Sequence, residues 1–321
     1  MFFDKKEKYK LAIIIPAYNE AQTIKAVLTQ FHNEYPEADF FVIDNNSVDS
    51  TSKIAAETLE ELKANGSIIF EPRKGKANAV RRAFIEIKAD VYVLVDADLT
   101  YFANDLAALI EPIVTNKADL VVGDRLSKGD YHKENKRRFH GFGNNLVKFL
   151  INFLFRTKLN DIMSGYRVFN NFFVKNFSIL SEGFELETEM TLFALDKKFR
   201  IKEIPINYQD RPCGSESKLN TFSDGFKVIK AIILIFKDYK PFVFFSFLSF
   251  AFLLIGFLIG FPVIIEFINT DYITKVPSAI LASGLMILSF LSFSIALILD
   301  TVVKHNRIYY ELNLLKTYHQ K

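Results

Sequence analysis

Two long stretches near the C-terminal end of the chain contain no charged residue. They cover residues 242–265 and 278–299. Each exceeds the ~20 residues that an α-helix needs to cross a hydrocarbon core of ~30 Å. Two buried helices of a soluble protein are the less favoured alternative, because such helices rarely lack a polar face over this length. The pattern therefore predicts a hairpin of two transmembrane helices, at about 242–265 and 278–302.

The charges around this hairpin predict its orientation. The connecting residues 266–276 contain a single basic residue, Lys275. Basic residues are more frequent outside it: Lys237 and Lys240 precede it, and Lys304, Arg307 and Lys316 follow it. By the positive-inside rule, the preceding domain and the tail 304–321 both face the cytoplasm. Residues 222–240 combine lysines with an apolar face, which predicts an amphipathic helix in the membrane interface.

Residues 1–221 predict one α/β domain. Short apolar runs alternate with segments of helical spacing, which is typical of βαβ units and of a mostly parallel sheet. The predicted strands are 11–15, 39–43, 67–70, 91–95 and 118–122, and the predicted helices between them are 20–34, 49–63, 75–88 and 105–115. Ligands of such sheets bind at the carboxyl ends of the strands.

Charge and cysteine content narrow the partners and the compartment. The net charge of +3 is too small to indicate a nucleic-acid partner. The single cysteine, Cys213, cannot form an internal disulfide, which agrees with a reducing compartment.

Acidic residues follow two of the predicted strands. Asp96-Ala97-Asp98 comes directly after 91–95, and Asp44 follows 39–43, so these carboxylates are expected at one edge of the sheet. Carboxylate oxygens suit Mg²⁺ or Mn²⁺, and such an ion would neutralise a departing diphosphate. An Asp-x-Asp pair alone is more often a solvated turn. Its position after a buried strand, matched by Asp44, favours the metal site.

Two further segments after strands suit a nucleotide. In 16–20, PAYNE, the Tyr18 ring can stack on a base and Glu20 can accept hydrogen bonds from a base or ribose; alternatively, Asn19 caps a helix. The basic loop 73–76, RKGK, precedes a predicted helix and suits a diphosphate, with a solvated surface turn as the alternative.

Seven motifs in order resemble a known family. They are PAYNE, DNNSVDST, EPRKGKANAVRRAF, VDADLTY, VVGDR, DIMSGYRVF and RPCGSESKLNT, within residues 10–225. This order strongly resembles the family 2 glycosyltransferases of the dolichyl-phosphate-mannose-synthase type, which include bacterial polyprenyl-phosphate glycosyltransferases with two C-terminal membrane helices. The resemblance implies a Rossmann-like GT-A fold. It also implies inverting transfer of a hexose from a UDP- or GDP-sugar to a polyprenyl phosphate, with Mg²⁺ or Mn²⁺, at the cytoplasmic face of the cell membrane.

The resemblance also implies roles for individual residues. The nucleotide sugar would be bound by Pro16, Ala17, Tyr18, Glu20, Asp44, Asn46, Lys76, Asp96 and Ala97, and the metal by Asp96 and Asp98. The acceptor and the phosphates would meet Arg138, Ser164, Gly165, Arg167, Arg211, Ser217 and Lys218, with Asp98, Asp161 and Arg125 forming the catalytic set. Thr100 departs from the family, in which several members carry Gln. In 184–190, FELETEM, the sequence does not indicate which glutamate faces the sugar.

A phosphate acceptor shapes the expected mechanism. It is already anionic at neutral pH, so it needs positioning and charge stabilisation more than a general base. Asp161 is therefore expected to orient the acceptor, with the role of base left open. The alternatives are a processive polysaccharide synthase, disfavoured by the absence of Trp; a nucleotidyltransferase; transfer to another lipid or glycan acceptor; and a non-catalytic membrane scaffold. The donor sugar, the polyprenol length and the oligomeric state, whether dimer or tetramer, stay open.

Overall fold

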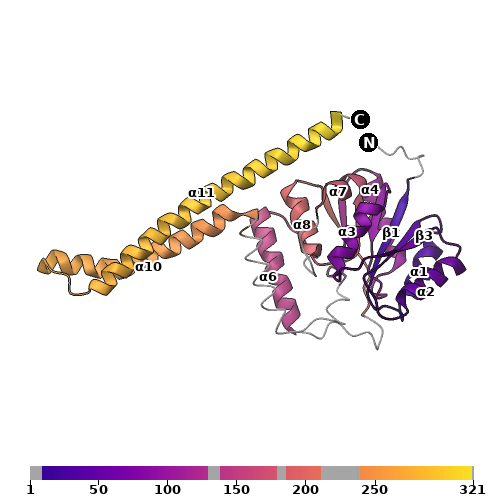
Figure 1. Cartoon of the computed structure of the whole chain (residues 1–321), viewed down its shortest axis with the longest axis horizontal. Coiled ribbons are helices and arrows are strands. Elements are labelled where there is room, and N and C mark those ends of the chain that lie inside the picture. Colours follow the sequence, from indigo (N-terminus) through magenta and orange to yellow (C-terminus); the bar gives the residue numbers. More distant parts are fainter. Residues whose placement is uncertain (1–8, 129–137, 179–185, 211–236, 238, 320–321) are drawn as a thin grey trace. The chain divides into compact units, whose positions relative to one another are not determined.

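The computed structural model describes residues 9–128, 138–178, 186–210, 237 and 239–319. The chain divides into two compact units, Met1–Gly225 and Phe226–Lys321. The first contains the α/β domain and the second contains the two long apolar helices (Figure 1).

One seven-stranded sheet organises the first unit, in the order β3-β2-β1-β4-β6-β5-β7. The strands are β1 Leu11–Ala17, β2 Asp39–Asp44, β3 Gly66–Phe70, β4 Val91–Leu94, β5 Leu120–Asp124, β6 Arg167–Asn170 and β7 Ile201–Pro205. β1 to β4 pair in parallel, as do β5 and β7, whereas β6 is antiparallel to both of its neighbours. The predicted mostly parallel sheet is confirmed. β6 and β7 lie in a region for which no individual strands were predicted.

Helices cover both faces of this sheet. On one face α1 Ile24–Glu34, α2 Thr51–Glu61, the 3₁₀ turn η1 Ala103–Asp105 and α4 Leu106–Val114 share a core with Ile13, Ile15 and Val93. On the other face lie α3 Lys76–Glu86, α7 Asn171–Asn176 and α8 Leu186–Asp196. There Phe84 of α3 packs edge-on against Tyr92 and Phe169. Burial on both faces explains why the parallel strands read as unbroken apolar runs.

Helix α6, Arg138–Phe155, also belongs to this unit. Val147 and Ile151 are buried, whereas Phe149 and Phe153 are exposed and stack with ring centroids 6.2 Å apart. Asn152 ties the end of the helix to the following loop, because its side chain donates to and accepts from the backbone of Leu159, both at 2.9 Å. The helix therefore presents an aromatic face to its surroundings while its loop leads into residue 160.

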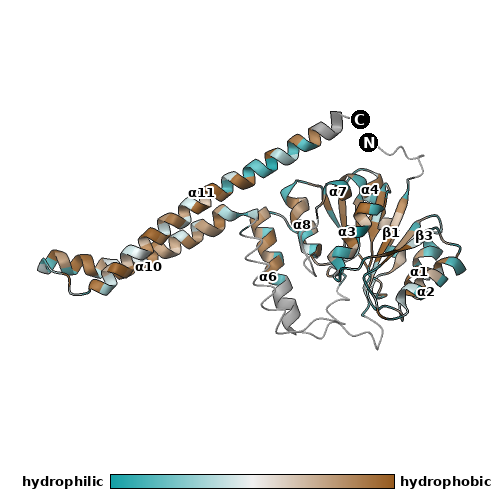
Figure 2. Ribbon diagram, viewed as in Figure 1, coloured by the Kyte–Doolittle hydropathy of each residue, from teal (hydrophilic) through white to brown (hydrophobic). Residues whose placement is uncertain are grey.

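Two long contacting helices lie in the described part of the second unit, α10 Pro241–Thr270 and α11 Val276–His319. Ser289 Oγ donates to the Ser249 carbonyl at 2.8 Å, and a Cβ atom on Gly256 would lie 3.2 Å from Leu285 Cβ. Small residues thus bring the two helices close together. Many Phe, Leu and Ile side chains of both helices are exposed. Figure 2 shows hydrophobic residues along α10 and the first part of α11.

Both helices are long and apolar enough to cross a membrane. The core helix of a soluble protein would bury such side chains, and these are mostly exposed. The second helix continues beyond residue 302, the predicted end of the membrane span, to His319, and residues 303–319 contain no Gly or Pro that would end it. The predicted interfacial helix 222–240 lies almost wholly outside the described residues.

Candidate active site

The ends of β1 and β2 place the first predicted ligand-binding residues side by side. Ala17 is in register with Asp44, and Pro16 is in register with Ile43. The Asp44 carboxylate is buried; it accepts from the Ser47 backbone N–H at 3.0 Å and from Ser52 Oγ at 2.6 Å. Asp44 is therefore held rigidly at the carboxyl edge of the sheet.

The segment after β1 is fastened to the loop after β2. Asn19 adopts a positive φ of 55°, and its Oδ1 accepts from the Val48 N–H at 2.9 Å. The Glu20 N–H donates to Thr51 Oγ1 at 2.8 Å. Asn19 is not the helix cap that the alternative interpretation predicted, because α1 begins only at Ile24. These contacts hold the segment that carries Tyr18 and Glu20 against the segment that follows Asp44.

Asn45 shapes the basic loop. Its Nδ2 donates to the Arg73 carbonyl at 2.6 Å and its Oδ1 accepts from the Gly75 N–H at 2.6 Å. Asn46 adds a bond to the Pro72 carbonyl at 3.1 Å. Gly75 has a φ of 123°, which side chains rarely adopt, so glycine is required there. Lys76, the first residue of α3, is thereby brought to the same edge as Asp44.

Within this loop Arg73 forms an ion pair with a buried acid, Glu71, which was not among the predicted site residues. Arg73 Nε and Nη2 lie 2.7 and 2.9 Å from the two oxygens of Glu71, which is 1% exposed. These hydrogen bonds lower the pKa of Glu71 to about 2. Lys74 instead lies over the Tyr18 ring, 5.4 Å from its centroid. The spacing of Glu71 and Arg73, two residues apart, is the local sequence signal that could have indicated their ion pair.

The two acids after β4 have different partners. Asp98 is buried, and its Oδ1 accepts from the backbone N–H and the hydroxyl of Thr100, at 3.2 and 2.6 Å. Asp96 Oδ1 lies 2.5 Å from Lys76 Nζ, which also lies 2.7 Å from Glu187 Oε1 on α8. Burial alone would lower the pKa of Lys76, but the two carboxylates raise it above its ordinary value. Lys76 is therefore a cation held between two acids.

Gly165 closes this group from the side of the loop 160–166. A Cβ atom there would lie 2.3 Å from Asp96 Oδ2 and 3.0 Å from Lys76 Nζ, so any larger residue would have to displace the Asp96 carboxylate. The Gly165 N–H donates to the Tyr101 hydroxyl at 3.0 Å. Burial raises the pKa of Tyr101 to about 12, which keeps the phenol neutral. The loop expected on the acceptor side thus lies against Asp96 and Lys76, which are expected on the donor side.

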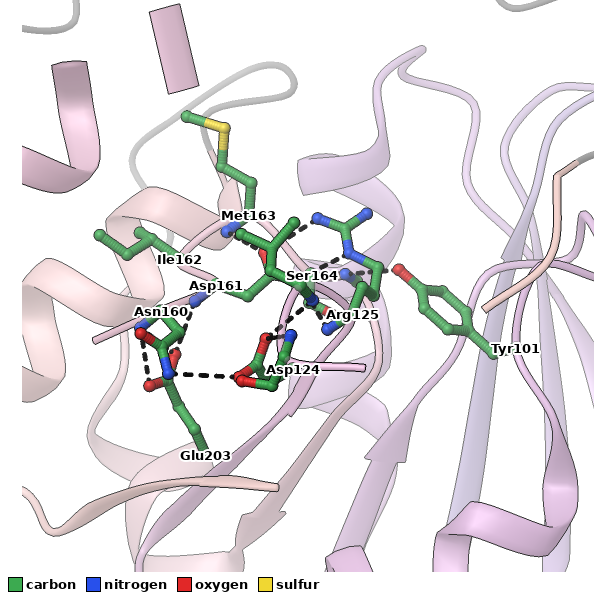
Figure 3. Close-up of polar contacts among 12 residues, drawn as sticks. Tyr101, Asp124, Arg125, Asn160, Asp161, Ile162, Met163, Ser164 and Glu203 are labelled. Atoms are coloured by element: carbon green, nitrogen blue, oxygen red, sulfur yellow. Dashed lines mark hydrogen bonds and ion pairs between the residues drawn. The ribbon is translucent and has the colours of Figure 1, made fainter. Parts of the chain in front are cut away.

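Arg125 and Asp161 form a buried ion pair (Figure 3). Arg125 donates to Asp161 from its backbone N–H, Nε and Nη2, at 3.1, 2.7 and 2.9 Å. Burial acts to raise the pKa of Asp161, but Arg125 holds it below its ordinary value. Glu203 of β7 supports the pair by accepting from the Asp161 N–H at 2.7 Å, and burial raises the pKa of Glu203. The Arg125 guanidinium also lies over the Tyr208 ring, 5.6 Å from its centroid.

Arg167 differs from the expectation that it lines the acceptor side. It is fully buried at the start of β6 and donates to the carbonyls of Ser164 and Ile162, at 2.8 and 2.5 Å, and to Thr191 Oγ1 at 3.1 Å. Burial lowers the pKa of Arg167 to about 10, at which it is still charged at neutral pH. Arg167 therefore fixes the shape of the loop from inside the domain, where an acceptor cannot reach it.

The remaining predicted residues are placed only in part. Ala97 is buried between the two acids, and Ser164 is buried beside Gly165. Arg138 begins α6, and nothing is described of its side chain. Arg211, Ser217 and Lys218 lie outside the described residues.

The acids after β4 fit a divalent ion that also binds phosphates. Among the described residues, no group of three or more His, Cys, Asp or Glu side chains is arranged to hold a metal by itself. A Mg²⁺ ion that also binds substrate phosphates needs only one or two protein carboxylates, because phosphate and water oxygens take its remaining coordination positions. Asp96 and Asp98 supply that number at the correct edge of the sheet.

Known proteins resemble this chain in sequence and in fold. The model of "Glycosyl transferase family 2" matches residues 12–177. Glycosyltransferase AglJ of Haloferax volcanii is 28% identical over 285 residues, covering 87% of this chain and 91% of that protein. Dolichyl-phosphate hexose transferase of the same organism is 27% identical over 223 residues, covering 70% and 92%.

A solved structure agrees with the fold. Glucosyl-3-phosphoglycerate synthase from Mycobacterium tuberculosis, in complex with Mn²⁺, UDP and phosphoglyceric acid, has a TM-score of 0.55 to this chain at 16% identity, covering 71% of this chain and 78% of that one. The GT-A fold that the resemblance implied is confirmed. The family match spans more than half of the chain and includes β2, which ends at Asp44, and β4, which precedes Asp96. This chain is a glycosyltransferase that belongs to glycosyl transferase family 2.

Proposed function

We propose that this glycosyltransferase transfers a hexose from a UDP- or GDP-sugar to a polyprenyl phosphate at a membrane. The observation that carries the proposal is the close approach of Gly165 to Asp96 and Lys76. It brings the loop of the expected acceptor side directly against the expected donor acids. The name of one relative, dolichyl-phosphate hexose transferase, supports the same acceptor class.

The donor side follows from the edge formed by β1, β2 and β4. Tyr18, Glu20 and Asp44 lie where the nucleoside would bind, and Lys76 lies beside the position of the diphosphate. A Mg²⁺ or Mn²⁺ ion held by Asp96 and Asp98 would neutralise the charge of the leaving diphosphate. The Mn²⁺ and UDP named with the M. tuberculosis enzyme support a metal and a nucleotide diphosphate of this kind.

The acceptor side rests on Arg125 and Asp161. A lipid phosphate is a competent nucleophile at neutral pH, so the chain must position it and offset the repulsion between two anions. Asp161 already accepts three hydrogen bonds from Arg125, and its pKa lies below the ordinary range. A carboxylate of such low basicity is a poor proton acceptor. We therefore assign Asp161 the role of orienting Arg125, which would meet a phosphate.

Membrane attachment supports a lipid acceptor. The helices α10 and α11 have the length and composition of membrane spans, and α6 exposes Phe149 and Phe153. We place the catalytic domain and both termini in the cytoplasm, on the basis of the lysines and arginines that flank the hairpin. A polyprenyl phosphate holds its head group at that interface, within reach of an enzyme anchored in the same bilayer.

A donor panel tests the proposal. The purified full-length chain in detergent is given UDP-glucose, UDP-N-acetylglucosamine, UDP-galactose or GDP-mannose, with Mn²⁺ or Mg²⁺, and nucleotide diphosphate release is measured with and without polyprenyl phosphate. We expect one donor to support release that requires both the lipid phosphate and the metal. Release that depends on a different lipid or glycan acceptor would replace the acceptor assignment, and no release from any donor would favour a non-catalytic scaffold.

A further inference from the structure

Glu187 is a buried acid that contacts the expected donor site through the side chain of Lys76. It is 5% exposed and lies on α8, more than one hundred residues along the chain from the lysine that it contacts. Its Oε1 accepts from Lys76 Nζ at 2.7 Å, and the same ammonium lies 2.5 Å from Asp96 Oδ1. One cation is thus shared by one acid of the Asp-x-Asp pair and one acid that lies outside it.

Because Lys76 is paired with Asp96, it competes with a metal ion for that carboxylate. An ammonium 2.5 Å from a carboxylate oxygen competes with any other cation for that oxygen. If Asp96 were the only anion near Lys76, binding of a metal ion to Asp96 would leave the ammonium unpaired in a largely buried place, which is unfavourable. Glu187 removes this penalty, because Lys76 keeps one carboxylate partner when Asp96 turns to the metal.

We propose that Glu187 is a positioning residue of the donor site: it holds Lys76 so that Asp96 can exchange the ammonium for a divalent cation while Lys76 stays beside the donor diphosphate. This inference rests on the proposed function, because it takes Asp96 as a metal ligand. It assigns to α8 a task in donor binding and selects Glu187 from the three alternating glutamates of residues 184–190.

Substitutions of Glu187 and Lys76 are expected to change metal binding in opposite directions. Glu187→Gln keeps the shape and removes the charge, so Lys76 stays on Asp96 and metal binding weakens. Lys76→Met removes the competing cation, so metal binding in the absence of nucleotide becomes tighter. General damage to the site would weaken binding in both variants. Because Glu187 acts through Lys76, its substitution has no further effect once Lys76 is gone.

Binding of Mn²⁺ measures this directly, without turnover. The full-length chain in detergent is titrated with Mn²⁺ in the absence of nucleotide, and free Mn²⁺ is followed by its electron paramagnetic resonance signal. Coulomb interactions of one unit charge in a partly buried site predict changes of about tenfold. We expect about tenfold weaker binding for E187Q, about tenfold tighter binding for K76M, and a double variant equal to K76M within about twofold.

A second titration and a matched control complete the test. With Mn²⁺ saturating, K76M is expected to bind UDP about tenfold more weakly than the wild type, since its diphosphate partner is lost. Glu189→Gln removes the same charge two residues further along α8, and it is expected to bind Mn²⁺ as the wild type does. If E187Q does not fold, Glu187→Asp takes its place, with a shorter arm that cannot hold Lys76 at 2.7 Å and a smaller weakening in the same direction.

The outcomes separate this inference from the proposed function. Weaker Mn²⁺ binding in both K76M and E187Q, additive effects in the double variant, or an equal effect of E189Q would overturn the role of Glu187 and leave the donor site intact. A wild-type chain that binds neither Mn²⁺ nor Mn²⁺-dependent UDP would overturn the metal site and the inference together.

Discussion

Replacing Gly165 by alanine tests whether the donor acids and the loop 160–166 form one site. The added Cβ atom would lie 2.3 Å from Asp96 Oδ2 and 3.0 Å from Lys76 Nζ. Ordinary van der Waals contact begins at 3.4 Å, so the carboxylate has to move by roughly 1 Å. The Lys76 ammonium, which lies on the other oxygen of the same carboxylate, has to follow or lose its partner.

The effect on activity should be larger than the effect on stability. Overpacking of this kind costs about 1–3 kcal/mol, or a thermal midpoint lower by about 2–12 °C in a domain of this size. A displacement of ~1 Å in a catalytic group reduces rates by about 100-fold, which corresponds to ~2.7 kcal/mol of transition-state stabilisation. We expect G165A to be folded and to lose about two orders of magnitude in kcat/KM for the donor.

The assay is the initial rate of nucleotide diphosphate release by the full-length chain at saturating polyprenyl phosphate, with the donor varied. Gly123→Ala is the matched control. A Cβ atom there would lie 2.7 Å from Ile206 Cδ1, and its three nearest atoms all belong to that side chain. We expect G123A to lose comparable stability and to keep kcat/KM within about threefold of the wild type. A G165A variant with wild-type kcat/KM, or equal losses in both variants, would refute the reasoning.

Two further predictions concern the buried acids. Asp98→Asn should abolish nearly all turnover because it removes a metal ligand, whereas Asp161→Asn should retain measurable turnover because Asn still accepts from Arg125. Initial rates of both variants test this ranking, and the reverse ranking would contradict the assigned roles. The lowered pKa values of Asp161 and Glu71 stabilise the folded domain at pH values above the unfolded value of about 4, and this stabilisation is lost as the pH falls through the lowered values. The urea midpoint of the wild type should therefore fall between pH 6 and pH 3, and less steeply in D161N; an equal slope in both would contradict the ion pair.

Much of the fold could be predicted because its signals are local. The strands at 11–15, 39–43 and 91–95 are apolar on both faces, and the structure contains β1, β2 and β4 at these places. The hairpin was evident from the length of its apolar runs. β6 is harder, because its antiparallel pairing between β4 and β5 depends on strands that are distant in the sequence.

The candidate site also has a part that could be predicted from the sequence and a part that could not. Asp44 and Asp96 could be assigned to one edge because parallel strands end together, and β2 and β4 both flank β1. The partners of the charged residues could not be assigned. Glu187 meets Lys76 only through the packing of α8 on the domain, and no periodicity encodes that contact. Arg167 is the reverse case: its motif suggested a ligand, whereas folding buries it beneath the loop.

The most direct test of the central claim is the identity of the product. The purified full-length chain is incubated with the accepted nucleotide sugar, polyprenyl phosphate and Mn²⁺, and the lipid fraction is analysed by mass spectrometry and NMR. The account predicts a polyprenyl phosphate that has gained one hexose, linked through the phosphate with an anomeric configuration opposite to that of the donor, and no such product from D98N. A sugar found on any other acceptor, or retained anomeric configuration, would contradict it.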